Sequence, residues 1–297
     1  MKFLQVELSN WALYRSTQIV QFNTTNEKPV VLINGENDKG KTSFFYGIRY
    51  ALFGELGLHN HPKEEYRYLH EWANLYSAKD GDDELCVELK IQLDDGSVFR
   101  IQRKRKFFQT PTGETVTLEQ KDQLTIFDDD EPLDVGKDGR AKQSWIEKNT
   151  LPIDVSQLLF VESIEDLWYI LERNVVKDLV NEDVVNKMNI ILEKLDRHKF
   201  HYYKFYLMDG KLRIGYRGAP SPPAGQQTLL ALIFILTARN IHAPDSFLVI
   251  DGLRRLDWRD RENALKLLFE NVSQLILLTP IDDPDVSKFF TQSLFLD

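Results

Sequence analysis

The chain contains 297 residues, which at about 150 residues per domain corresponds to one large or two modest domains. Hydrophobic residues make up 42% of the sequence and charged residues 28%, and this composition excludes a chain that is disordered throughout. The formal net charge of −9 excludes a uniformly basic nucleic-acid-binding domain. Any contact with DNA therefore has to come from a local basic patch.

Cys86 is the only cysteine in the sequence. Neither an intramolecular disulfide nor a cysteine zinc site can form, which predicts a reduced, cytoplasmic protein. The longest apolar stretch, residues 229–238, is about half as long as a membrane-spanning helix requires. Residues 1–8 lack the apolar core of a secretory signal, and we expect no interaction with a membrane.

The first part of the chain is predicted to combine short strands with one helix. Apolar patterns indicate strands at residues 3–8, 18–22 and 29–34. The last of these is an unbroken apolar run of the kind that is buried on both faces of a sheet. It leads into a glycine-containing segment, after which residues 42–53 are predicted to form a helix that ends at Gly54.

The middle of the chain is predicted to form an antiparallel lobe and a helical segment. Residues 84–127 have the alternation typical of antiparallel strands, with a turn at residues 94–96. Residues 164–199 are predicted as a helix because apolar residues recur at spacings of three and four. This helix would measure only about 54 Å, which leaves no room for a long coiled-coil arm.

The last third of the chain has the strand, helix and strand pattern of a parallel α/β sheet. In chain order, the predicted elements are a hairpin at residues 205–215, an apolar helix at 226–240, a buried strand at 246–251, a polar helix at 259–270 and a buried strand at 275–279.

The most specific motif is Gly-Glu-Asn-Asp-Lys-Gly-Lys-Thr at residues 35–42, which matches the phosphate loop G-x-x-x-x-G-K-[ST] and lies between a predicted buried strand and a helix. In such a loop, backbone N–H groups surround a polyphosphate, Lys41 reaches the outer phosphates and Thr42 offers its hydroxyl to Mg²⁺. We therefore predict that the chain binds ATP or GTP. The predicted nucleotide-binding residues here are Asn34, Gly35, Glu36, Asn37, Asp38, Lys39, Gly40, Lys41, Thr42 and Ser43.

A nucleotide site of this kind also needs a carboxylate that holds the Mg²⁺ shell, usually at the end of a neighbouring buried strand. Asp251 follows the apolar run at residues 247–250 and is the candidate for this role. The alternative is that Asp251 is a turn residue before Gly252.

Three segments, residues 8–15, 34–37 and 47–54, resemble the N-terminal half-head of SMC-like ABC ATPases. The closest pattern is that of the Dnd-type ATPase of DNA phosphorothioation systems, and SbcC-type repair ATPases are more distant. The resemblance implies an α/β P-loop NTPase fold in which two half-heads form one ABC-ATPase domain. The implied parts are an N-terminal half-head with an antiparallel β-lobe at residues 1–163, a short helical protrusion at 164–204 and a C-terminal half-head at 205–297.

The resemblance also implies roles for individual residues. Residues 151–162 resemble the Q-loop region, which puts Glu162 near Mg²⁺ and the attacking water. The resemblance therefore implies Glu162 and Asp251 as catalytic residues. It implies Thr42, Asp251 and Glu162 as ligands of Mg²⁺. Residues 222–227 resemble the signature motif, in which Gly225 contacts the γ-phosphate on the opposing head. The alternative for Glu162 is an ordinary surface glutamate.

Arg15 resembles the arginine that approaches nucleotide or DNA in this family, and the alternative is a simple exposed hairpin arginine.

The chain departs from the family pattern at three contacts. The signature serine is replaced by Pro223, Gly252 stands where a glutamate often orients water, and Pro280 falls where the switch histidine usually lies. Electrostatic contacts of this kind contribute about 10²- to 10³-fold each to a rate. We therefore expect nucleotide binding with weak hydrolysis, unless a substitute such as Asp260 or Glu162 restores the rate.

The densest basic cluster lies in residues 100–106, on or just beyond a predicted strand. Alternation puts Arg103 and Arg105 on one face and Lys104 and Lys106 on the other. Basic residues on an exposed strand edge commonly serve to prevent aggregation, and that alternative stays open beside a role in binding the phosphate backbone. The predicted DNA-binding residues are Arg100, Arg103, Lys104 and Arg105.

The leading hypothesis is an SMC-like ABC ATPase that uses ATP and Mg²⁺. Its ATP-bound heads would associate as a homodimer or heterodimer and engage double-stranded DNA, a nuclease or a defence-system partner in DNA repair, DNA modification or anti-phage defence. One alternative is a catalytically degenerate pseudo-ATPase that binds ATP as a structural ligand and acts as an interaction subunit. Another is an ATP-independent DNA-binding scaffold.

Overall fold

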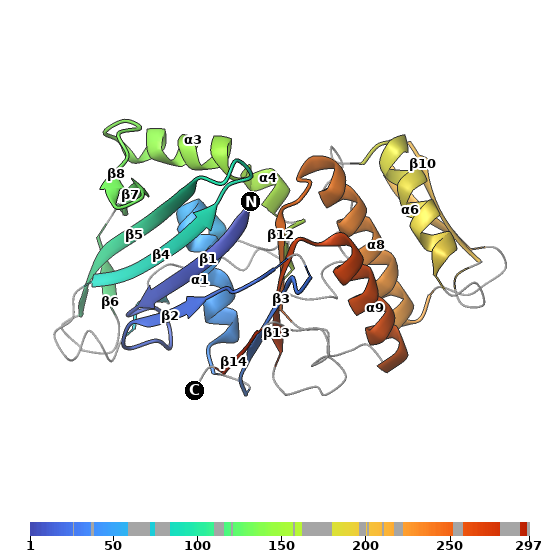
Figure 1. Ribbon diagram of the computed structural model, residues 1–297, viewed down its shortest axis with the longest axis horizontal. Coiled ribbons are helices and arrows are strands. Elements are labelled where there is room, and N and C mark those ends of the chain that lie inside the picture. The colour runs from blue at the N-terminus through green and yellow to red at the C-terminus, as the bar shows by residue number, and fades with distance from the viewer. Residues whose placement is uncertain are drawn as a thin grey trace. The chain divides into compact units, whose positions relative to one another are not determined.

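The computed structural model of the protein forms two compact units, which are described separately (Figure 1). Unit 1 comprises Met1–Thr25, Val31–Ile153 and Thr291–Asp297, and unit 2 comprises Asn26–Val30 and Asp154–Phe290. The predicted half-head boundaries at residues 163 and 204 stay a prediction. The structure describes residues 1–25, 27–36, 39–58, 72–74, 84–109, 116–119, 121–156, 158–161, 180–195, 200, 202–209, 211–216, 222–251, 258–279 and 292–295.

Unit 1 contains the predicted antiparallel lobe, which is larger than the sequence indicated because the first two strands of the chain belong to it. The strand order is β2-β1-β4-β5-β7-β8, and β6 pairs with β5. The strands are β1 (Lys2–Ser9), β2 (Gln18–Gln21), β4 (Glu84–Gln92), β5 (Val98–Gln109), β6 (Val116–Leu118), β7 (Gln123–Asp128) and β8 (Glu131–Pro132).

One face of this sheet forms part of the core of unit 1. Leu85, Leu89 and Ile91 of β4 are fully buried, and so is Ile101 of β5 opposite Leu89. The helix α1 (Lys41–Phe53) packs against β1, β4 and β5. Because side chains on a strand alternate between the two faces, the inward residues of β5 face this helix.

The helix α1 is buried on all sides. Every residue of α1 except Thr42 is buried, as expected for a helix that is enclosed by other elements rather than lying at the surface. It follows β3 (Val30–Asn34), which is buried throughout and pairs in parallel with β14 (Gln292–Phe295). The predicted end of the helix is confirmed, and Gly54 begins the 3₁₀ helix η1 (Gly54–Leu58).

A second helix of unit 1, α3 (Gly139–Asn149), was not predicted from the sequence. Its N-cap Asp138 accepts a hydrogen bond from the Ala141 amide at 2.7 Å. Ile146 is the only buried hydrophobic residue of this helix, so its apolar pattern is too weak to be recognised by periodicity.

Unit 2 contains the predicted parallel arrangement at the C-terminal side of the chain. β12 (Phe247–Asp251) lies between β13 (Gln274–Thr279) and the short β9 (Phe160–Val161), and both pairings are parallel. The long apolar helix is α8 (Ala224–His242), whose residues 229–238 are all buried. The polar helix between the strands is α9 (Trp258–Asn271), and the single-turn helix α4 (Ile153–Ser156) precedes β9.

The helix predicted at residues 164–199 is wrong as one continuous element. Residues 164–179 and 196–199 lie outside the described residues, and the helix in the described part is α6 (Glu182–Lys194). Asn181 is extended, with φ −136° and ψ 179°, and its side chain accepts a hydrogen bond from the Val184 amide. The helix α6 therefore begins at Glu182, because asparagine favours the N-cap position.

The hairpin predicted at residues 205–215 is confirmed as β10 (Tyr203–Met208) and β11 (Lys211–Tyr216). Asn189 of α6 holds this hairpin by exchanging two hydrogen bonds of 2.9 Å with the backbone of Phe205. Within the described residues, no helix is both long and apolar enough to cross a membrane.

We predict that the Cys86 thiol reacts slowly in the folded protein. Burial raises the pKa of this thiol to about 12 from its ordinary value of 9, and only the thiolate is nucleophilic. Alkylation by iodoacetamide at pH 8 is expected to be more than about tenfold slower in buffer than in denaturant. Because burial favours the thiol form, the unfolded chain loses the Cys86 proton at a lower pH than the folded protein does. The free energy of unfolding should therefore fall as the pH rises from 9 toward 12. Equal alkylation rates in both solvents would contradict the packing of β4.

Candidate nucleotide-binding site

The predicted phosphate loop connects β3 to α1 in unit 1. Asn34 is the last residue of β3 and is buried, and Gly40 is the N-cap of α1. The motif therefore has the strand, loop and helix context that it requires. Asn37 and Asp38 lie outside the described residues.

The Lys41 side chain turns back into the loop. Its Nζ donates hydrogen bonds to the carbonyl oxygens of Gly35, at 2.7 Å, and Glu36, at 2.6 Å, and the residue is only 9% exposed. The Lys39 amide also donates to the Glu36 carbonyl, at 3.4 Å. The positive charge of Lys41 is therefore held inside the curve of the loop, where it can balance the charge of a polyphosphate.

The start of α1 fits an anionic ligand. Gly40 has φ 91°, in the left-handed region where residues with a Cβ are strained. A Cβ at this position would also lie 2.8 Å from Oη of Tyr14. Because Gly40 has no side chain that could cap the helix, the first-turn N–H groups and the positive end of the helix dipole face the loop and favour an anion. Thr42 is exposed in this turn and could provide an oxygen ligand for Mg²⁺.

Two aromatic residues, which the sequence did not identify, brace the first turn of α1. The Tyr14 hydroxyl donates to the Gly40 carbonyl at 2.9 Å, and Trp11 Nε1 donates to the Ser43 carbonyl at 2.8 Å. The Trp11 ring also stacks on Tyr50 in the third turn of α1, with ring centroids 5.0 Å apart. Burial raises the pKa of the Tyr14 hydroxyl far above its usual value, so it remains a donor at all physiological pH values.

The predicted residue Arg15 follows Tyr14 directly and is exposed. The only signal for the bracing residues was their place in residues 8–15, which carry the family resemblance, and nothing in that segment indicated which side chains face α1.

The other predicted site residues belong to unit 2. Asp251 ends β12 and is half-buried, and Gly225 lies in the first turn of α8. Pro223 is the N-cap of α8 and is exposed. The roles assigned to these residues stay predictions. Glu162, Gly252 and Pro280 lie outside the described residues, and Asp260 lies in α9, where its side chain is not described.

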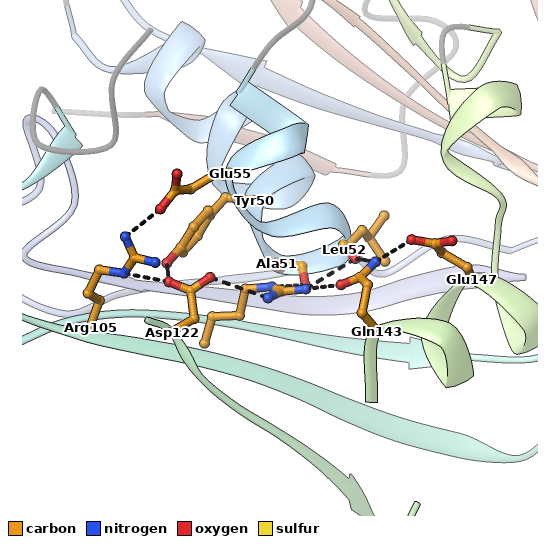
Figure 2. Close-up of polar contacts among 9 residues, drawn as sticks. Tyr50, Ala51, Leu52, Glu55, Arg105, Asp122, Gln143 and Glu147 are labelled. Carbon is orange, nitrogen blue, oxygen red and sulfur yellow. Dashed lines mark hydrogen bonds and ion pairs between the residues drawn. The ribbon is translucent and has the colours of Figure 1, made fainter. Parts of the chain in front are cut away.

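Arg103 and Arg105 were predicted to contact DNA, and the structure corrects that expectation. Alternation does place them on one face of β5, but it is the inward face, and they are only 4% and 6% exposed. Both guanidinium groups pair with Asp122, Arg103 through Nη1 at 3.4 Å and Arg105 through Nε at 2.7 Å. Figure 2 shows Arg105 between Asp122 and Glu55. Buried, paired cations cannot reach a phosphate backbone.

Arg100 and Lys104 lie on the opposite face of β5 and are partly exposed. Arg100 pairs with Glu88 at 3.2 Å and lies over the ring of Phe127, with Cζ 4.1 Å from the centroid. Lys104 pairs with Glu84 at 2.8 Å, and this hydrogen bond raises the pKa of the ammonium group. DNA binding by these two residues stays a prediction, and a DNA phosphate would have to compete with the carboxylates.

Comparisons with known proteins bear on the family and the fold of the chain. The family model AAA_23, described as an AAA domain, matches residues 5–200. Among curated proteins, the SbcC component of the nuclease SbcCD from Staphylococcus haemolyticus (strain JCSC1435) is 28% identical over 116 residues. This match covers 39% of the present chain and only 10% of the length of that protein.

Solved structures share the fold at low sequence identity. The SMC head domain from Thermotoga maritima has a TM-score of 0.58 at 15% identity, covering 99% of this chain and 94% of that one. An SMC head bound to the C-winged helix domain of ScpA has a TM-score of 0.62 at 14% identity, with coverage of 95% and 91%. The recombination mediator RecF in its ATPrS form has a TM-score of 0.53 at 14% identity, with coverage of 95% and 93%. The predicted P-loop NTPase head fold is therefore confirmed.

We predict that Tyr14→Phe lowers the free energy of unfolding by about 1 kcal/mol, because the buried Gly40 carbonyl loses one of its two donors and keeps only the Phe44 amide. Denaturant unfolding followed by circular dichroism would measure this change. Tyr206→Phe is the matched control, since Tyr206 is 39% exposed and should tolerate loss of its hydroxyl. Equal stability of the two variants would contradict the bracing role of Tyr14.

Proposed function

The chain belongs to the AAA_23 family of AAA domains, and from this premise we propose that it is an SMC/SbcC-like ATPase head that binds Mg-ATP and changes its association with other molecules when it does so. The observation that carries the proposal is the phosphate loop, in which Lys41 is held inside the curve between β3 and the positive end of α1. A lysine ammonium group and the positive end of a helix dipole at one loop together favour the binding of an anion.

In this proposal each part of the site has its own task. Lys41 and the N-terminal end of α1 balance the charge of the phosphates, and Thr42 holds Mg²⁺. Asp251 and Glu162 complete the Mg²⁺ shell and orient water, and Gly225 contacts the nucleotide of an opposing head. Bound Mg-ATP supplies the charge that would join two heads, as a homodimer or a heterodimer.

The cellular setting is proposed from the relatives. SbcC is part of a nuclease, and RecF is a recombination mediator. We infer that the present chain acts on double-stranded DNA or with a nuclease or defence-system partner, in DNA repair, DNA modification or anti-phage defence. The Dnd-type pattern in the sequence favours DNA phosphorothioation systems within that range.

A second candidate function is a pseudo-ATPase in which ATP acts as a structural ligand. The observation that favours it is Pro223 at the N-cap of α8, where its carbonyl accepts a hydrogen bond from the Gln227 amide at 2.9 Å. A proline at the signature position has neither a hydroxyl nor an N–H to donate. A turn that cannot donate at this position favours binding without efficient hydrolysis.

We predict that Lys41→Ala weakens Mg-ATP binding by at least about 100-fold, because the loop loses its charge-assisted contacts to phosphate. Isothermal titration calorimetry with the purified chain would measure the affinity. Lys90→Ala is the matched control, since Lys90 is an exposed lysine of β4 in the same unit. Wild-type affinity in the Lys41 variant would overturn the proposed site.

We also predict slow ATP turnover by the wild-type chain and a higher rate for Pro223→Ser, by about tenfold or more, because serine restores a donor to the signature-like turn. Steady-state phosphate release, with and without duplex DNA and with Lys41→Ala as the blank, would measure both rates. No turnover in either protein, together with ATP-dependent association detected by light scattering, would favour the pseudo-ATPase.

A further inference from the structure

The C-terminal end of α1 carries a network of polar contacts that neither the motif nor the proposed function accounts for (Figure 2). Nε of Arg103 donates to the Ala51 carbonyl at 2.9 Å, and Nη2 donates to the Leu52 carbonyl at 3.4 Å. Both acceptors belong to the last turn of α1, whose carbonyl groups have no partner within the helix. A guanidinium group there also faces the negative end of the helix dipole.

The surroundings of Arg103 hold its guanidinium group in place. Nη1 pairs with Asp122 at 3.4 Å, and Nη2 also donates to Oε1 of Gln143 on α3. Asp122 in turn accepts a hydrogen bond of 2.6 Å from the hydroxyl of Tyr50, a side chain of α1 itself. Arg103 is therefore connected to α1 by its own contacts with the helix backbone and through Asp122.

Gly54 provides the space that this contact needs. A Cβ at Gly54 would lie 3.1 Å from Nη1 of Arg103 and 3.4 Å from Oδ2 of Asp122. The residue also has φ 62°, in the left-handed region that favours glycine. The end of α1 is thus shaped so that a guanidinium group can approach its carbonyl groups.

The same helix begins at the phosphate loop. α1 has 13 residues and begins with Lys41, and at 1.5 Å per residue it is a rod about 20 Å long. A small rotation of such a rod at its C-terminal end moves the first turn and the Lys41 side chain. At that first turn the braces are the two hydrogen bonds from Tyr14 and Trp11.

We propose that Arg103 is a positioning residue for nucleotide binding, which acts through α1 by holding the last carbonyl groups of the helix against the β-lobe. This inference rests on the proposed binding of Mg-ATP by the phosphate loop and assigns Arg103 no contact with the nucleotide. It gives the inward-facing cluster on β5 a role in place of the DNA contact that the sequence suggested.

Arg103→Lys tests the proposal, because lysine keeps the charge but cannot donate to Ala51, Leu52 and Asp122 from one planar group. The Kd for Mg-ATP is expected to rise about tenfold in the folded variant, as for the loss of a charge-assisted hydrogen bond. Arg105→Lys is the matched control, since Arg105 lies on the same strand and pairs with the same carboxylate. Among the described residues, Arg105 makes its ion pairs with Asp122 and Glu55 rather than bonds to the α1 backbone. The Kd of this control should stay close to that of the wild-type chain, because Arg105 makes no hydrogen bond to the α1 backbone among the described residues.

A purely structural role for Arg103 is distinguished by two further readouts. Thermal unfolding without nucleotide shows whether each variant is folded at the assay temperature, and hydrogen exchange reports on the amides of the first turn of α1. A positioning role predicts weaker binding and faster exchange at this turn in the folded Arg103→Lys protein. A lower unfolding temperature with unchanged Kd and unchanged exchange overturns it, and so does an equal loss of affinity in Arg105→Lys.

Gln143→Ala keeps the proposal testable if the arginine variant does not fold. Gln143 Nε2 donates to the Leu52 carbonyl at 3.1 Å, and its loss should raise the Kd for Mg-ATP about threefold. An unchanged Kd in folded Gln143→Ala overturns the inference. Failure of the wild-type chain to bind Mg-ATP at all instead overturns the proposed function, so the two failures are distinct.

Discussion

The fixed position of α1 is the constraint on which the candidate site depends. Tyr14 and Trp11 hold the first turn of the helix by hydrogen bonds to its carbonyl groups, and Arg103 and Gln143 donate to the carbonyl groups of the last turn. Backbone carbonyls have fixed directions, so contacts to them orient the helix more strictly than apolar packing does. A phosphate loop needs this precision because its ligand is bound largely by backbone groups.

The charges of β5 show how alternation separates two electrostatic tasks on one strand. Arg103 and Arg105 point inward, and their burial is tolerated because carboxylates and backbone carbonyl groups surround them. Arg100 and Lys104 point outward and form partly exposed pairs with glutamates. The apparent basic patch is therefore divided between an interior network and a face whose positive charge is largely balanced.

The elements that were predicted correctly are those whose signal is local. The spacing of glycines and lysine identified the phosphate loop, and unbroken apolar runs identified β3, β12 and β13. The elements that were missed lack such a signal. α3 buries a single hydrophobic side chain, and the break before α6 depends on one asparagine side chain that caps the helix. Periodicity averages over many residues and cannot register an interruption that one hydrogen bond produces.

Neighbouring residues and their spacing were sufficient to predict the strand, loop and helix of the candidate nucleotide site, the alternation along β5 and the parallel pattern of the C-terminal strands. Which face of β5 is buried, and which residues hold α1, became known from the packing of unit 1. Alternation defines two faces of a strand, but it does not specify which of them meets the core. Tyr14, Arg103 and Gln143 reach α1 from distant parts of the chain, and their contacts exist only after the sheet and the helices of unit 1 have packed together.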